Sequence, residues 1–177
     1  CFNVDDAMSP EYSVWLLPEA AQEVTLIRTI SDLSIRLGES AFAPHVTIQG
    51  DLFQSPAQLA ASLSRLAAET PVQRWCVQQL ECSAHFFRCL FLRFAQEPVF
   101  EHLQSELVAC TRTREGMSPY PHLSLAYGQQ RPETVEQRDE LVNAFNGREI
   151  VFDRLAVCRS SKDIPIADWQ IVDQYPL

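Results

Sequence analysis

Apolar residues recur along the chain in two periods, and these periods predict alternating strands and helices. Residues 13–17 form a short run of β-favouring residues that Pro18 closes. The next stretch, 19–37, carries leucine and isoleucine at the three- and four-residue steps that share one helix face. Gly38 follows this face and is expected to end the helix, because glycine readily adopts the left-handed backbone of a helix C-cap.

The same alternation continues through the first half of the chain. A strand is predicted over 45–48, and a helix is predicted over 56–69, where a serine cap and a first-turn proline mark the start. Two further strands, 72–82 and 88–94, are predicted on either side of a turn at 83–85.

The second half repeats this order of elements. Its predicted elements are helices at 98–110 and 134–145, strands at 122–125, 149–158 and 169–172, and a polar loop at 111–121. The pattern predicts an α+β fold with two similar lobes, in which antiparallel sheets line a central groove and the helices cover the outer faces.

The length of the chain and the repeat of elements predict a single domain. We expect this two-lobed domain to span residues 8–177, with lobes of approximately 8–97 and 98–177 that are free to exchange strands. Residues 1–7 lack the basic and apolar regions of a secretory signal, and we interpret them as a leader or a remnant of expression ahead of Met8.

The acidic composition narrows the classes of partner. Hydrophobic residues make up 46% of the chain, which is enough for a sizeable core. The formal net charge of −9 argues against a protein that holds long nucleic acid, since that function needs clustered lysine and arginine. No apolar run reaches the roughly 18 residues that a membrane-spanning helix requires. We therefore expect a cytoplasmic monomer that binds a small ligand, with no membrane and no long nucleic acid as partner.

The cysteines predict neither a metal site nor a disulfide framework. The sequence holds six cysteines but no C-x-x-C pair, and Cys82 with His85 has a ligand-like spacing that no second pair completes. We expect no metal and no cofactor. Most of the thiols are interpreted as small apolar residues of a protein in a reducing cytosol, while a disulfide between Cys82 and Cys89 is left open.

Two segments, 44–50 and 121–128, resemble each other and contain the candidate chemistry. Both begin with the order proline, histidine, apolar, hydroxyl, apolar, and both end on glycine. Because side chains alternate between the faces of a strand, each histidine shares a face with the hydroxyl residue two positions on. The two pairs are His45 with Thr47 and His122 with Ser124.

These residue types suit the hydrolysis of a cyclic phosphodiester. That reaction needs a base for the attacking water, an acid for the departing oxygen and donors for the phosphoryl oxygens. Histidine titrates near neutrality, so two imidazoles on opposite sides of the phosphorus serve as base and acid for in-line attack. The alternative interpretation is that both histidines lie on a polar sheet face and that the hydroxyl residues reflect β propensity alone.

The paired motifs resemble those of the two-histidine (2H) phosphoesterase superfamily, and within it the cyclic phosphodiesterase group. The resemblance extends over Met8–Leu177 and includes the segments Ser13–Pro18 and Trp169–Val172 beside the two motifs. It implies catalysis by His45 and His122, with Thr47 and Ser124 holding the phosphate. Which histidine is the base and which the acid does not follow from the sequence.

The resemblance also implies the class of substrate. It is a small cyclic phosphodiester such as a 2′,3′-cyclic nucleotide, opened to the 2′-phosphate, or ADP-ribose 1″,2″-cyclic phosphate. The chain is thus interpreted as a metal-independent phosphoric diester hydrolase. The alternatives are an RNA end-processing or 2′–5′ ligase-type enzyme of the same superfamily, and a nucleotide-binding module without catalysis.

Aromatic residues near the motifs are candidates for contact with a nucleobase, which stacks on aromatic faces. The family pattern points to Trp15, Phe87 and Tyr127. We assign Trp15 and Tyr127 to substrate binding, whereas for Phe87 a core position is equally favoured. Strict alternation puts Tyr127 on the face opposite His122, so it reaches the groove only if the strand bends before Gly128.

Other polar residues are interpreted as bystanders. His85 falls in a turn and His102 in a helix, and neither has a hydroxyl residue two positions on. The segment 159–162 combines basic residues with serines that suit phosphate, but a solvated turn is the favoured interpretation.

Overall fold

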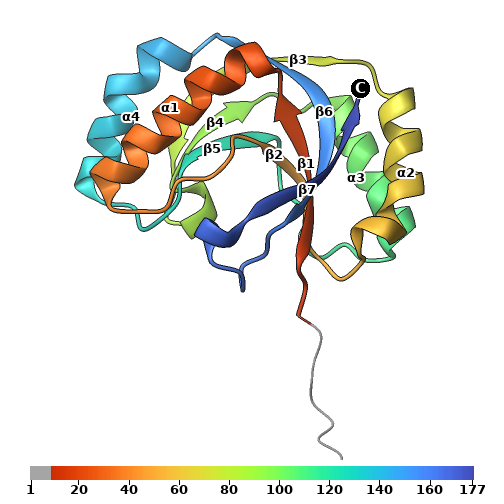
Figure 1. Cartoon of the computed structure of the whole chain (residues 1–177). Coiled ribbons are helices and arrows are strands. Elements are labelled where there is room, and N and C mark those ends of the chain that lie inside the picture. Colours follow the sequence, from red (N-terminus) through yellow and green to blue (C-terminus); the bar gives the residue numbers. More distant parts are fainter. Residues whose placement is uncertain (1–8) are drawn as a thin grey trace, which may run out of the picture.

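In the computed structural model, which describes residues 9–177, seven strands form one curled antiparallel sheet with helices on its outer side (Figure 1). The strands are β1 (Tyr12–Pro18), β2 (Val46–Leu52), β3 (Gln73–Cys82), β4 (Leu90–Phe94), β5 (His122–Ala126), β6 (Glu149–Arg159) and β7 (Gln170–Pro176). The α-helices are α1 (Ala20–Leu37), α2 (Pro56–Glu69), α3 (Pro98–Thr111) and α4 (Pro132–Phe145). The α+β class and the outer helices are confirmed, while the leader assigned to residues 1–7 lies outside the described residues.

Local signals in the sequence fix the ends of the helices. α1 ends at Gly38, whose φ of 69° is left-handed and whose N–H donates to the Ser34 carbonyl. At the start of α2, the side chains and main-chain N–H groups of Ser55 and Gln58 bond reciprocally, as the capping residues predict. The connection between β3 and β4 is longer than the turn predicted at 83–85, because a short 3₁₀ helix, Phe86–Arg88, follows that turn.

The order of strands interleaves the two halves of the sequence. The sheet runs β2-β1-β6-β3-β4-β5. β7 lies off this path and pairs with residues 154–159 of β6, whereas β3 pairs with residues 149–152. β6 from the second half therefore lies between β1 and β3 from the first. The helices cross over as well, since α1 contacts β5 and α3 contacts β2. The lobe boundaries 8–97 and 98–177 stay a prediction within this interleaved arrangement.

Alternation along the strands separates the core from the inner face of the sheet. Val14 and Leu16 of β1 belong to the main core under the helices, while Trp15 lies in a smaller cluster on the other face. In the same way the apolar residues of both motif strands, Val46 and Ile48 in β2 and Leu123 and Leu125 in β5, are buried in the main core. The intervening polar residues are thereby directed to the inner face.

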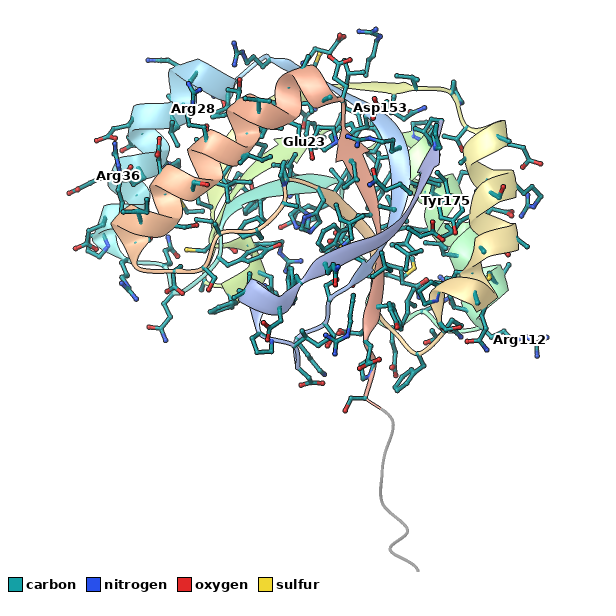
Figure 2. The ribbon with its side chains drawn as sticks, in the orientation of Figure 1. Glu23, Arg28, Arg36, Arg112, Asp153 and Tyr175 are labelled. Carbon is teal, nitrogen blue, oxygen red and sulfur yellow. The ribbon has the colours of Figure 1, made fainter. Side chains whose placement is uncertain are left out.

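Charged side chains are spread over the outside of the molecule. Figure 2 shows Arg28 and Arg36 pointing outward from α1, far from Arg112 beyond α3. Arg36 forms an exposed ion pair with Glu140 at 3.1 Å, and such pairs contribute little to stability. No helix in residues 9–177 combines the length and apolar character needed to cross a membrane.

The described cysteines are all free thiols, including the two for which the sequence leaves a disulfide open. Cys82 and Cys89 flank the connection between β3 and β4 but are not bonded to each other. Burial raises the pKa of both thiols, so they are poor nucleophiles. Across residues 9–177 there is also no group of three or more His, Cys, Asp or Glu side chains that is arranged to hold a metal.

A close backbone contact ties β2 to the loop between α3 and β5. The Gly50 N–H donates to the Gly116 carbonyl at 2.7 Å. Gly116 has a left-handed φ of 68°, and a Cβ added there would come within 1.8 Å of the Gly50 carbonyl oxygen. Only glycine fits this position without moving the backbone.

We predict that Gly116→Ala lowers the free energy of unfolding by about 3 kcal/mol, from left-handed strain together with the clash. Gly147→Ala is the matched control, since Gly147 is also left-handed but a Cβ there meets nothing within 4 Å. It should cost only about 1 kcal/mol. Denaturant unfolding of both variants measures the difference, and equal losses would contradict the contact.

Candidate active site

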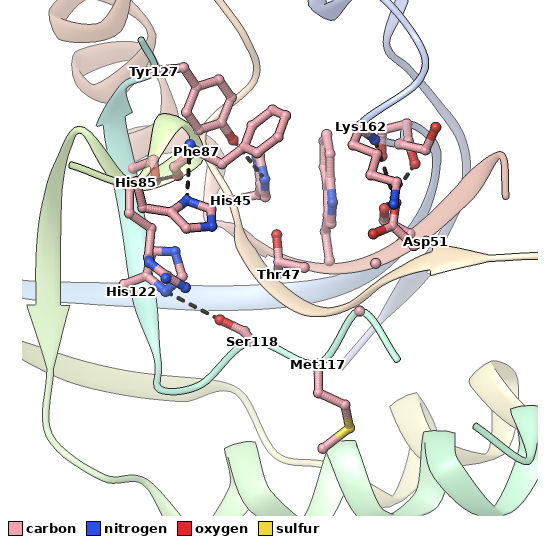
Figure 3. A pocket seen from close by; sticks show the side chains of 18 of the residues that line it. His45, Thr47, Asp51, His85, Phe87, Met117, Ser118, His122, Tyr127 and Lys162 are labelled. Carbon is pink, nitrogen blue, oxygen red and sulfur yellow. Dashed lines mark hydrogen bonds between the residues drawn. The ribbon is translucent and has the colours of Figure 1, made fainter. Parts of the chain in front are cut away.

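A single pocket on the inner face of the sheet collects the six predicted site residues (Figure 3). Its volume is about 240 Å³, and its lining includes His45, Thr47, His122, Ser124, Trp15 and Tyr127. β2 and β5 stand at opposite ends of the strand order, yet they contact each other because the sheet curls. The curl therefore brings the two motifs, which are far apart in the sequence, to one cavity.

The two histidines are held in the same way. His45 Nδ1 donates to the carbonyl of Ala43 at 2.6 Å, and His122 Nδ1 donates to the carbonyl of Tyr120 at 3.0 Å. Each ring thus bonds the main chain two residues before it. Because a carbonyl only accepts, this bond fixes the proton of the neutral ring on Nδ1 and leaves the lone pair on Nε2.

Burial controls the ionisation of both rings. His45 is 5% exposed and His122 is 8% exposed. Desolvation is the main reason that the pKa of His45 falls to about 3; the hydrogen bond to Ala43 opposes this decrease, and the nearby His122 adds to it. Desolvation likewise lowers the pKa of His122 to about 4, with Arg88 and Arg93 adding to the decrease. Both imidazoles are therefore neutral near pH 7.

The hydroxyl residues differ in their present partners. Ser124 Oγ donates to the main-chain carbonyl of Phe87 at 2.8 Å, so its proton must turn before it serves a ligand. Thr47 is half-buried and lines the pocket. Both lie two residues beyond a histidine and line the same cavity, as alternation predicts.

The two aromatic residues assigned to substrate contact are largely covered. Trp15 is 2% exposed and stacks on His45, with 3.5 Å between ring centroids and an interplanar angle of 7°. Tyr127 lies just past the end of β5, which lets it reach the pocket, and it stacks on Phe42 at 3.7 Å. Its hydroxyl lies 3.5 Å from His45 Nε2. These contacts hold the histidine in position and leave little ring surface for a base.

The more accessible rings are Phe87 and Trp169. Both are half-buried and line the pocket, and their rings are close to parallel, with an angle of 23° and centroids 6.0 Å apart. The sequence analysis includes Trp169 in a segment that resembles the family but does not assign it to the site. Nothing in the spacing of residues shows that the segment before β7 returns to the groove.

Three polar residues of the pocket were missed or set aside by sequence reasoning. His85, taken as a bystander, is exposed at the rim, where its Nδ1 accepts from the Phe87 N–H at 3.2 Å. Ser118 Oγ lies 3.2 Å from His122 Nδ1 and donates to the Tyr120 carbonyl, so it supports the same tether. Arg88 lines the pocket with its Nε buried and without a partner.

The segment 159–162 differs from the solvated turn that was expected. Ser160 and Ser161 are buried and line the pocket together with Lys162. The other bystander, His102, is exposed on α3, as the helix pattern predicts.

Comparisons with known proteins give a family match and a set of similar folds. The sequence matches the family model of the 2′-5′ RNA ligase superfamily over residues 17–163. No sequence match to a curated protein was found. The fold is similar to the crystal structure of TT0787 from Thermus thermophilus, with a TM-score of 0.62 and 16% identity over 94% of this chain and 97% of that one.

Structures of LigT from E. coli are also similar in fold. The complex with 3′-AMP has a TM-score of 0.60 and 14% identity, covering 96% of this chain and 98% of that one. The complex with ATP has a TM-score of 0.54 and 14% identity, covering 97% and 99%. At this level of identity the likeness shows a shared fold.

The buried histidines should make the protein less stable in acid. Their folded pKa values lie below the unfolded value of about 6.5, so the unfolded state binds more protons between about pH 6.5 and pH 4. Stability should fall with decreasing pH in this window, by up to about 1.4 kcal/mol per pH unit for each histidine. Denaturant unfolding at several pH values measures the slope. The double variant His45→Gln/His122→Gln should lose stability less steeply as the pH falls. If its slope equals that of the unmodified protein, the two histidines are not the cause of the acid sensitivity.

Proposed function

Since the chain belongs to the 2′-5′ RNA ligase superfamily of 2H phosphoesterases, we propose that it hydrolyses small cyclic phosphodiesters with His45 and His122 as acid and base. The substrates proposed are 2′,3′-cyclic nucleotides, opened to 2′-phosphates, and ADP-ribose 1″,2″-cyclic phosphate. One observation supports this above the others: two imidazoles with equivalent main-chain tethers line one pocket of about 240 Å³.

The tethers suit both halves of the proton transfer. A neutral imidazole with its lone pair on Nε2 accepts a proton from the attacking water as the new P–O bond forms. The other imidazole, protonated, gives its Nε2 proton to the ring oxygen as that P–O bond breaks. The phosphodiester anion itself supplies the charge that favours this imidazolium, because an adjacent negative charge raises a histidine pKa.

Donors for the phosphoryl oxygens are available beside each histidine. Thr47 and Ser124 each follow a histidine by two residues and line the pocket, so their hydroxyls suit the non-bridging oxygens. Arg88 adds a positive charge near His122, which is the reason it lowers the pKa of that ring. A developing phosphorane charge is stabilised by the same guanidinium.

For the nucleobase we propose contact with Phe87 and Trp169. Their half-exposed rings offer surface that the covered rings of Trp15 and Tyr127 lack. Stacking on an aromatic side chain contributes about 1–3 kcal/mol per base. The complexes of LigT with 3′-AMP and ATP support the view that this fold accepts nucleotides.

An RNA end-processing or 2′–5′ ligase-type activity is the second candidate, and the matching family model favours it by its description. The net charge of −9 favours a small substrate over an oligonucleotide, because RNA binding relies on neutralising many phosphates. A nucleotide-binding module without catalysis has no need for two tethered imidazoles.

The first test is turnover of 2′,3′-cyclic AMP followed by phosphorus NMR in the presence of a chelator. We expect a 2′-monophosphate product, and we expect His45→Ala or His122→Ala to lower kcat by more than about 100-fold while the fold is retained. His102→Ala, on the exposed face of α3, is the matched control. Action on oligonucleotides alone would favour the second candidate, and tight binding without turnover would favour the binding module.

The second test is the pH dependence of the kinetic constants. In the pH profile of kcat/KM, the decrease at high pH gives the pKa of the acid histidine in the free enzyme, where burial keeps that pKa low. In the pH profile of kcat, the corresponding decrease gives the pKa of the same histidine beside the bound anion, which raises this pKa. The decrease in kcat should therefore lie at higher pH than that in kcat/KM, and coincident decreases would contradict an acid that is protonated with the help of the substrate.

A further inference from the structure

The only lysine of the sequence, Lys162, lines the same pocket as the two histidines. In Figure 3, Lys162 and Asp51 lie on the other side of Thr47 from His122. The ion pairs found in residues 9–177 are all made by arginines, and none of them uses Lys162. The lysine therefore adds an uncommitted positive charge to one end of the pocket.

The loop that carries Lys162 is fixed by hydrogen bonds from two other segments of the chain. Ser13 Oγ donates to the carbonyl of Ser160 at 3.0 Å, and the Ser160 N–H donates to the carbonyl of Glu11 at 2.8 Å. The Lys162 N–H donates to Asp51 Oδ1 at 3.4 Å. This end of the pocket is therefore preorganised and needs no ordering of the loop when a ligand binds.

Within this end, one buried polar group lacks a partner. Ser160 is 1% exposed, lines the pocket, and its Oγ makes no hydrogen bond with any described residue. A buried hydroxyl without a partner is costly, so a ligand acceptor or a water is expected beside it. Ser160 and Lys162 line the same pocket, and a hydroxyl donor together with an ammonium group is a combination that suits phosphate oxygens.

The strand geometry sets the separation between this end and the histidines. Trp15 stacks on His45, and Ser13, two residues earlier on the same face of β1, bonds the Ser160 carbonyl. Two residues of a strand span about 7 Å. A ribose that carries a cyclic phosphate on its 2′ and 3′ oxygens and a second phosphate on its 5′ oxygen spans a distance of this order.

We propose that Lys162 and Ser160 form a second phosphate subsite, which selects cyclic phosphodiesters that carry a further phosphate on the 5′ side of the ribose. The proposal rests on the function proposed above, with the cyclic phosphate between His45 and His122 and the second phosphate at Lys162. Asp51 places one negative charge at the edge of this subsite, because its carboxylate is held there by the Lys162 N–H.

The kinetic test compares 2′,3′-cyclic AMP with the same molecule carrying a 5′-phosphate. We expect kcat/KM to favour the 5′-phosphorylated substrate by about tenfold, as for one charge-assisted hydrogen-bonded contact. Lys162→Gln should reduce this preference to about one, Lys162→Arg should keep it, and Asp51→Asn should increase it. Arg159→Gln is the matched control, because Arg159 is an exposed neighbour that pairs with Glu11 and does not line the pocket. A preference that Lys162→Gln leaves unchanged would overturn the subsite.

A binding test separates this proposal from the catalytic one. Reductive methylation with ¹³C-formaldehyde labels the single lysine, so its dimethylamine resonance reports the subsite apart from the amino terminus. Adenosine 3′,5′-bisphosphate should shift this resonance and bind about tenfold more tightly than adenosine 3′-monophosphate, which should not shift it. Equal effects of the two ligands would overturn the subsite even if cyclic AMP is hydrolysed. The expected shift without turnover of any cyclic substrate would support the subsite and refute the catalytic proposal.

Discussion

The curl of one antiparallel sheet, which brings its edge strands β2 and β5 into contact, is the constraint on which the pocket depends. Each edge strand buries its apolar residues under the helices and directs its histidine and hydroxyl inward. A flatter sheet would separate the two motifs. The packing of α1 on β5 and of α3 on β2 therefore serves the site as well as the core.

Burial and tethering act together on the histidines. Removing an imidazole from water disfavours its charged form, and the main-chain carbonyl at Nδ1 satisfies one ring nitrogen and orients the other. Trp15 on one side and Tyr127 near Nε2 further restrict the ring of His45. The free protein thus holds two oriented neutral imidazoles, and under the proposed function a bound anion converts one of them into the acid.

The sequence predicted those features that depend on near neighbours along the chain. Caps and periodicity gave the ends of α1 and α2, and period-two alternation gave the shared face of His45 and Thr47. The position of β6 between β1 and β3 could not be predicted from the sequence. Alternation shows which face of a sheet a residue occupies, but it does not show which strand lies beside it. Ser160 was misjudged for the same reason, since its burial comes from Ser13 and Glu11, far away in the sequence.

The matching tethers of His45 and His122 make the centre of the pocket close to symmetric under exchange of the two halves. Under the proposed function, two proton carriers with the same tether do not by themselves select the orientation in which a cyclic ester lies between them. The polarity of ring opening, and with it the choice of the oxygen that departs, must then come from the unequal walls. On one side stand Phe87 and Trp169, and on another the loop of Lys162, so under the proposed function the choice of the departing oxygen depends on these walls rather than on the two motifs.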